Sequence, residues 1–341
     1  MTRRLVVDLA AVRPVWRIPS AQVAAIAALL PGWDVIPVDA PANSDGDGGG
    51  GSPAAVAAAT GAEIYLGFGV PKGIQDAARA TLRWAHTATA GVAPSLAGLR
   101  GTHVTVTNSA GIHAEPMADW VLAALAYFAR GFDVAVRAQA GGRWDKDAFT
   151  DGSLALPELR DLRVGIFGLG GIGTSVAQRA LSLGMRVAGV RRRPEQGGPV
   201  GVAWVGGFEA LGRLASESDV LVITVPRTEE TVNAVGAGVL GRLPAGALVV
   251  NVSRGGILDE GALMDALESG HLRGAALDVF ATEPLPPGHP LWRHPRVLIT
   301  PHVSAVTARF WDREMALIRE NVRRYLGGES LVNVVDLEAG Y

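Results

Sequence analysis

The stretch RVGIFGLGGIG, residues 163–173, decides the fold of this chain. Its first part, Arg163–Phe167, is an apolar strand, and a helical pattern follows from Ile172 to Leu183. In a Gly-x-Gly-x-x-Gly turn, the first glycine permits a tight turn, the second lets the backbone approach a pyrophosphate, and the third lets helix pack on strand. We therefore expect a dinucleotide to be bound by these motif residues: Gly168, Gly170, Gly171, Ile172 and Gly173.

Glycine is so common in this chain that the motif needs its context. With 44 glycines in 341 residues, chance predicts roughly 0.7 matches, and three occur, starting at Gly46, Gly168 and Gly236. The first lies in the low-complexity run 43–53, and the third follows no strand end and is soon stopped by Pro244. The match at Gly168 has the strand–turn–helix–strand context. Its alternative interpretation is an ordinary tight turn between strand and helix.

Apolar runs and helical patterns alternate along the rest of the chain. Strands are expected at 5–7, 34–38, 63–68, 82–87, 104–107, 163–167, 186–190, 219–225, 247–252, 275–279 and 297–300. Helices are expected at 20–30, 115–130, 172–183, 208–215, 260–268 and 306–325. The alternation predicts an α/β protein with two doubly wound, parallel-sheet domains, in which the final helix returns to the first domain.

Composition excludes several classes of protein. The 31 basic and 33 acidic residues give a net charge of −2, which favours neither nucleic acid nor an anionic membrane as a partner. Cysteine is absent, so disulfides and thiolate sites are excluded, and the histidines show no metal-ligand spacing. The apolar helical run Trp120–Ala129 is shorter than the roughly 20 residues that a membrane span needs. We expect a cytoplasmic protein without a metal.

The end of the strand at 186–190, the second strand of the predicted dinucleotide-binding fold, bears on the choice between NAD(H) and NADP(H). A site for NAD usually carries Asp or Glu there, which binds the ribose 2′-hydroxyl. This chain has Val190-Arg191-Arg192-Arg193 instead, and guanidinium groups suit a 2′-phosphate. We expect Arg191 and Arg192 to bind the cofactor and to favour NADP(H), with NAD(H) as the alternative. A solvated loop in an arginine-rich chain would look the same.

Polar groups follow three apolar strands of the second half, where α/β sheets bind ligands. They supply Arg254, Glu283 and His302, a set sufficient for reducing an α-keto acid. Arg254 would bind the substrate carboxylate and polarise the carbonyl, and His302 would supply the proton. Glu283 would raise the pKa of His302 by stabilising the imidazolium. A nicotinamide would supply the hydride.

The chain resembles the D-isomer-specific 2-hydroxyacid dehydrogenase family over nearly its whole length. The segments NVSRGG at 251–256, LDVFATEPLP at 277–286 and TPH at 300–302 match the family's Arg, Glu and His motifs in order. GLGGIG and the strand SDVLVITVP at 218–226 lie where the family has them. The resemblance implies a Rossmann dinucleotide-binding domain at 108–299, inserted in a flavodoxin-like split catalytic domain at 1–107 and 300–341.

The resemblance also implies roles for individual residues. Arg254 would bind substrate, Glu283 would be the partner of His302, and His302 would be the general acid/base. The loop Thr89–Val92 matches the loop whose backbone N–H groups bind the substrate carboxylate, which implicates Ala90, Gly91 and Val92. Further cofactor contacts are expected at three positions: Pro226, Val252 and Asp278, the last with the nicotinamide amide. The helix Glu115–Arg130 and the arm after it resemble the family's homodimer surface.

Two departures from the family pattern narrow the expected activity. Pro226-Arg227-Thr228 replaces the usual Pro-Leu-Thr, and Arg191 replaces the usual acid. Both resemble the glyoxylate/hydroxypyruvate reductase branch, so an NADP(H)-dependent reductase of small 2-keto acids is the leading hypothesis. Glu283 argues against formate dehydrogenase, which has Gln there. The alternatives are an NAD-linked D-2-hydroxyacid dehydrogenase for a larger keto acid and a non-catalytic dinucleotide-sensing protein, because transcriptional corepressors also resemble this family.

Overall fold

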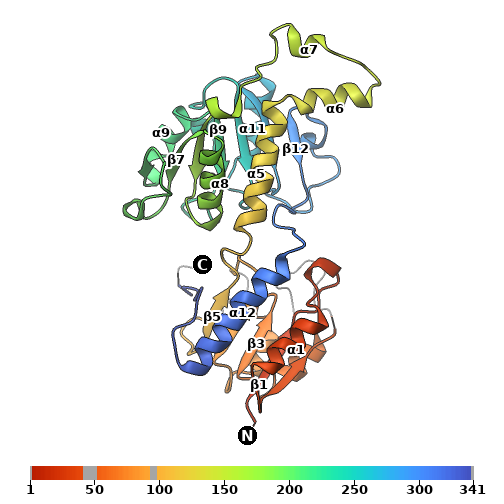
Figure 1. Ribbon diagram of the computed structural model, residues 1–341, viewed down its shortest axis with the longest axis vertical. Coiled ribbons are helices and arrows are strands. Elements are labelled where there is room, and N and C mark those ends of the chain that lie inside the picture. Colours follow the sequence, from red (N-terminus) through yellow and green to blue (C-terminus); the bar gives the residue numbers. More distant parts are fainter. Residues whose placement is uncertain (1, 41–51, 93–97, 339–341) are drawn as a thin grey trace. The chain divides into compact units, whose positions relative to one another are not determined.

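The computed structural model describes residues 2–40, 52–92 and 98–338, so most of the low-complexity run at 43–53 lies outside it. The chain forms two compact units (Figure 1), unit 1 from residues 1–113 and 306–341 and unit 2 from residues 114–305. Both boundaries fall six residues later than expected. Ser109 donates its backbone N–H to Thr89 in unit 1, and residues 303 and 304 donate theirs to Asp278 in unit 2. These bonds tie each segment to its unit.

Unit 1 is built on a parallel sheet in the order β2-β1-β3-β4-β5, which is the flavodoxin-like order. Its strands are β1 (Arg4–Asp8), β2 (Asp34–Pro37), β3 (Ile64–Gly67), β4 (Trp84–Thr87) and β5 (Thr105–Asn108). Its helices are α1 (Ser20–Ala28), α2 (Pro53–Ala59), α3 (Lys72–Ala77) and α12 (Phe310–Gly327).

Helix α12 closes unit 1, as the sequence predicts. Its apolar side chains share a core with β1 and β3: Phe310, Trp311, Met315, Ile318 and Val322. The same helix carries the buried Glu314, whose Oε1 lies 2.7 Å from Nε2 of His86 in β4. Its Oε2 accepts a hydrogen bond of 2.7 Å from the Ser109 hydroxyl. The end of the chain is therefore an integral part of the first sheet's packing.

Unit 2 contains a parallel sheet in the order β12-β11-β10-β9-β6-β7-β8. Counted along the chain from β6, this is the Rossmann order 3-2-1-4-5-6 with one strand added at the edge. The strands are β6 (Arg163–Phe167), β7 (Arg186–Val190), β8 (Val205–Gly206), β9 (Val220–Ile223), β10 (Ala247–Asn251), β11 (Leu272–Leu277) and β12 (Val297–Ile299). The helices are α5 (Ala114–Ala129), α6 (Phe132–Ala140), α7 (Asp147–Thr150), α8 (Gly171–Ser182), α9 (Leu211–Ser216), α10 (Ala237–Leu240) and α11 (Glu260–Glu268).

The predicted fold class is confirmed, and a few element boundaries are wrong. Strand β11 begins at Leu272 rather than Ala275, because Leu272 and Gly274 already pair with β10. Helix α12 begins at Phe310 rather than Val306, since the residues before it form a turn closed by Phe310 N–H and Thr307 O. The two-residue strand β8 is too short to leave a periodic pattern in the sequence.

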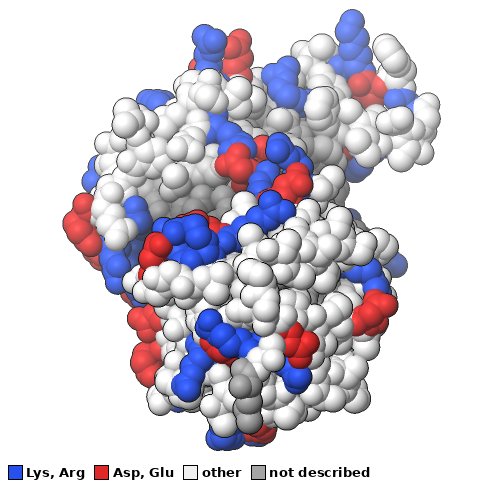
Figure 2. Space-filling view, turned by 60° about the horizontal axis from the view of Figure 1, so that its bottom comes forward, with Lys and Arg blue, Asp and Glu red and all other residues white. Residues whose placement is uncertain are grey.

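Within the described residues, every helix is too short or too polar to cross a membrane. Basic and acidic side chains lie mixed over the described surface that Figure 2 draws. This pattern agrees with the nearly balanced charge of the sequence.

Candidate active site

The glycine loop between β6 and α8 has the geometry of a phosphate cradle. Gly168 has φ +115°, and a Cβ atom there would lie 2.8 Å from the backbone of Thr224. A Cβ atom on Gly173 would overlap the carbonyl oxygen of Gly168, so helix and turn approach too closely for any side chain. At Gly170 the same atom would meet no described residue within 4 Å, and no described side chain caps α8. The open N-terminus of α8 therefore fits a pyrophosphate.

Arg191 follows β7 directly, and its side chain lies against the loop that comes next. Nη1 donates to the carbonyl oxygen of Gly197 at 2.8 Å, and Nη2 donates to Oε1 of Gln196. Arg192 is exposed at the same strand end. Sequence reasoning did not identify Gln196 or Gly197, because a bond across a loop leaves no pattern in the residue order.

Arg254 and Glu283 follow neighbouring strands, and the two segments that carry them are in close backbone contact. A Cβ atom on Gly255 would overlap the backbone of Phe280, so the loop after β10 lies directly on the segment after β11. Arg254 Nη1 donates to the carbonyl oxygen of Ser253 at 2.6 Å. Neighbouring protein atoms desolvate the guanidinium and lower its pKa, and the charge of Glu283 opposes that shift. The group remains a cation at neutral pH.

His302 and Glu283 form a hydrogen-bonded pair. His302 Nδ1 lies 2.8 Å from Oε2 of Glu283, while Oε1 of Glu283 accepts from the Phe280 N–H at 2.8 Å. His302 has φ +55°, a conformation that non-glycine residues rarely adopt and that is common at functional sites. Because Glu283 occupies Nδ1, Nε2 is the ring nitrogen left for a substrate.

Glu283 is held as a carboxylate by its surroundings. Desolvation alone would raise its pKa. The hydrogen bonds from His302 and the Phe280 N–H, together with the charges of His302 and Arg254, outweigh desolvation and lower the pKa below its usual value. The carboxylate is therefore available to stabilise a positive charge on the imidazole.

Asp278 lies beneath the turn that carries His302. Its side chain is fully buried. Oδ1 accepts from the Thr300 hydroxyl and, at 2.8 Å, from the Val303 N–H, and Oδ2 accepts from the Ser304 N–H at 2.8 Å. Both oxygens are thus used in holding the turn, a role that sequence reasoning did not anticipate. The expected contact with a nicotinamide amide stays a prediction.

The remaining predicted residues lie as follows. Val252 is buried directly after β10, and Pro226 is exposed after β9. In unit 1, the loop Thr89–Val92 follows β4, and Val92 points into the core. Asn108 Nδ2 donates to the Ala90 carbonyl at 2.9 Å, and Thr89 Oγ1 donates to the Gly91 carbonyl at 2.8 Å.

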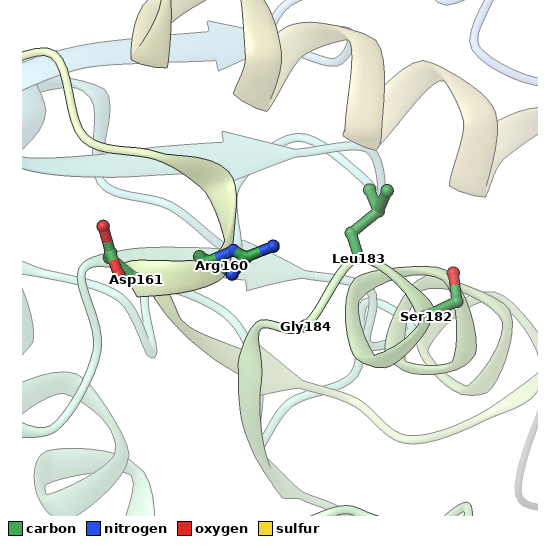
Figure 3. Close-up of a pocket in the computed structure, with 5 residues that line it drawn as sticks. All are labelled: Arg160, Asp161, Ser182, Leu183 and Gly184. Atoms are coloured by element: carbon green, nitrogen blue, oxygen red, sulfur yellow. The ribbon is translucent and has the colours of Figure 1, made fainter.

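A separate surface depression lies at the other end of α8 (Figure 3). It is lined by Arg160, Asp161, Ser182, Leu183 and Gly184. Because α8 starts at the glycine loop and ends at Ser182, this depression is remote from the cradle. Within the described residues, no group of three His, Asp or Glu side chains is arranged to hold a metal ion.

Comparison with known proteins agrees with the fold and the glycine cradle, which define a dinucleotide-binding α/β protein. The family model described as "D-isomer specific 2-hydroxyacid dehydrogenase, NAD binding domain" matches residues 122–304. The chain belongs to the D-isomer specific 2-hydroxyacid dehydrogenase family, as the sequence motifs predict. It is an oxidoreductase whose unit 2 contains the domain that binds a nicotinamide dinucleotide.

Individual relatives are similar over most of the chain. Glyoxylate/hydroxypyruvate reductase A of Photorhabdus laumondii is 35% identical over 225 residues, which are 66% of this chain and 68% of that protein. A D-isomer specific 2-hydroxyacid dehydrogenase from Xanthobacter autotrophicus, solved with NADPH and MES, is 32% identical with a TM-score of 0.77 over all of both chains. The NADPH-dependent glyoxylate/hydroxypyruvate reductase of Sinorhizobium meliloti, solved with NADP and sulfate, is 25% identical with a TM-score of 0.75 over all of both chains.

Proposed function

We propose that this protein is an NADP(H)-dependent reductase of small 2-keto acids such as glyoxylate or hydroxypyruvate. The observation that carries the proposal is the 2.8 Å contact between His302 Nδ1 and Glu283 Oε2, beside the cationic loop of Arg254. The similarity to a glyoxylate/hydroxypyruvate reductase supports the substrate class.

The three side chains divide the chemistry among them. Arg254 binds the substrate carboxylate and draws electron density from the neighbouring carbonyl. A nicotinamide held in this unit would supply the hydride that the carbonyl carbon accepts. His302 gives the proton on Nε2 to the carbonyl oxygen, which completes the hydroxyl group. Glu283 orients the ring and stabilises the imidazolium before that proton leaves.

The cofactor is held by the glycine cradle, and Arg191 and Arg192 select its phosphorylated form. The N-terminus of α8 would hold the pyrophosphate, and Pro226 and Val252 would contact the dinucleotide. Three arginines and no acidic residue directly follow β7, which favours a ribose 2′-phosphate over a free hydroxyl. NADPH in the related Xanthobacter structure supports this preference.

Unit 1 contributes to substrate binding. The loop Ala90, Gly91 and Val92 offers backbone N–H groups to the substrate carboxylate.

A second copy of the chain completes the assembly. Helices α6 and α7 form an arm that projects from the body of unit 2 (Figure 1), and this arm exposes Phe132, Val136 and Trp144. Exposed apolar side chains of this kind suit a homodimer interface. Light scattering of the wild type should give twice the mass of one chain. The double variant with Trp144→Ser and Phe132→Ser should give the mass of a single chain.

Oxidation of NADPH and NADH at 340 nm, with glyoxylate, hydroxypyruvate and pyruvate, tests the activity. We expect turnover with NADPH, and its loss in a His302→Ala variant that binds NADPH normally. A clear preference for NADH would contradict the cofactor assignment but not the chemistry. Tight NADPH binding without turnover of any 2-keto acid would favour the dinucleotide-sensing alternative.

A further inference from the structure

Among the described residues, the groups that hold the Arg191 guanidinium are neutral. Its side chain donates to the Gly197 carbonyl and to the Gln196 amide oxygen, and across the described chain no carboxylate lies within 4.0 Å of it. Its backbone is also fixed, because the Arg191 N–H donates to the Gly206 carbonyl at 2.9 Å, next to the pairing of β7 with β8. The backbone bond to β8 and the side-chain bonds to the loop together hold the guanidinium in one position.

Two other partly buried arginines of the same unit are paired with carboxylates. Arg163 is paired with Asp219 at 2.6 Å, and Arg273 is paired with Asp133 at 2.7 Å. In each case a carboxylate balances the guanidinium, which leaves little charge for a ligand. Two side-chain hydrogen bonds also position Arg191, yet no carboxylate among the described residues balances its charge.

The two bonds leave most of the guanidinium available. Of five N–H donors, one on Nη1 and one on Nη2 are used, so Nε and one N–H on each Nη remain. A guanidinium fixed in one plane loses less conformational entropy when it binds an anion bidentately. A phosphate is the ligand that matches such a group.

We propose that Gln196 is a positioning residue for 2′-phosphate recognition, holding Arg191 in place without neutralising it. This inference rests on the NADP(H) preference of the proposed function. The inference requires that the side chain at position 196 is neutral. A carboxylate at position 196 would hold the same guanidinium but compete with the phosphate for its charge and its donors.

Binding of nucleotide fragments tests the role of Gln196 without any turnover. The probes are adenosine 2′,5′-bisphosphate and 5′-AMP, which differ by the 2′-phosphate, titrated calorimetrically into the full chain. Gln196→Glu should weaken the bisphosphate by at least about tenfold and leave 5′-AMP within about twofold. Gln196→Ala, which only frees the arginine, should weaken the bisphosphate by about two- to fivefold.

Val200→Glu is the matched control. Val200 is fully exposed in the same loop, so this variant adds the same negative charge without contacting Arg191. We expect it to change bisphosphate binding by less than about twofold at moderate ionic strength. In an Arg191→Leu background, Gln196→Glu should have no further effect on bisphosphate affinity, as a double-mutant cycle requires. Unfolding midpoints without ligand show that the variants are folded.

The outcomes separate this inference from the proposed function. If the wild type prefers the bisphosphate but Gln196→Glu binds it equally well, only the role of Gln196 is wrong. The same conclusion follows if Val200→Glu weakens binding as strongly as Gln196→Glu. If the wild type does not distinguish the two probes, the NADP(H) preference itself is wrong, and this inference fails with it.

Discussion

His302 Nδ1 lies 2.8 Å from Glu283 Oε2, and the two residues are 19 positions apart in the chain. Two anchors bring them together. Glu283 is fixed by the Phe280 N–H after β11, and the His302 N–H donates to the Asp278 carbonyl at 2.9 Å. Both residues therefore depend on the backbone that follows β11.

Glu283→Gln should lower kcat with NADPH and glyoxylate by about 10- to 100-fold, because a neutral amide stabilises an imidazolium less well than a carboxylate. The KM for NADPH should stay nearly unchanged, since Glu283 acts on the proton and not on the dinucleotide. Steady-state kinetics over several pH values measures both. Glu209→Gln, an exposed position in the same unit, is the control and should keep wild-type kinetics.

The pH dependence of stability should also depend on Glu283. Its pKa is lower in the folded protein than in the unfolded chain, so the folded state favours the carboxylate. The resulting stabilisation is complete above the unfolded pKa, near 4.3, and is lost as the pH falls through the lower folded pKa. The difference in the free energy of unfolding between the wild type and Glu283→Gln should be constant above about pH 5.5 and should shrink below about pH 4. A difference that grows on acidification would contradict this assignment.

Gly173→Ala should lower the stability of the protein, whereas Gly170→Ala should lower its affinity for NADPH. The Cβ on residue 173 would overlap the Gly168 carbonyl, so Gly173→Ala should destabilise the protein by about 1–3 kcal/mol or more. Gly170→Ala adds a methyl group in open space, so its stability should be unchanged while its affinity for NADPH falls. Urea unfolding and calorimetry measure the two quantities. Normal NADPH binding by a folded Gly170→Ala protein would place the pyrophosphate elsewhere.

Asp278→Ala should destabilise the chain by about 2–4 kcal/mol. The substitution leaves the N–H groups of Val303 and the buried Ser304 without their acceptor and removes the bond to Thr300. Urea unfolding compares it with Asp265→Ala, whose side chain is exposed in α11. Equal stability of the two variants would show that the turn holds itself without Asp278.

Much of the fold could be predicted from the sequence because it follows from local patterns. The glycine motif, the apolar strands and the order of the three polar segments each occupy a few neighbouring residues, and parallel sheets place the carboxyl ends of strands together. Those rules predict the two sheets and one site that combines Arg254, Glu283 and His302. The expected boundary at residue 300 assigned His302 to the other domain, whereas the structure places all three residues in unit 2.

The contacts that position these residues could not be predicted in the same way. Asp278 serves as an acceptor for a turn more than 20 residues later, and Gln196 contacts Arg191 only because the loop returns to the strand end. Such hydrogen bonds depend on backbone paths that residue types alone do not determine. The strand β8 was missed because two residues are too few to show a period.

The place of α12 has a consequence for how the protein is made. Unit 2 is one continuous stretch, residues 114–305, whereas unit 1 needs both ends of the chain. The face of β1 and β3 that receives Phe310, Trp311 and Ile318 is synthesised long before α12 leaves the ribosome. Until α12 has been synthesised, that apolar face lacks its cover and is exposed to chaperones and to aggregation. Synthesis of α12, rather than synthesis of the first sheet, therefore sets the moment at which unit 1 can become native.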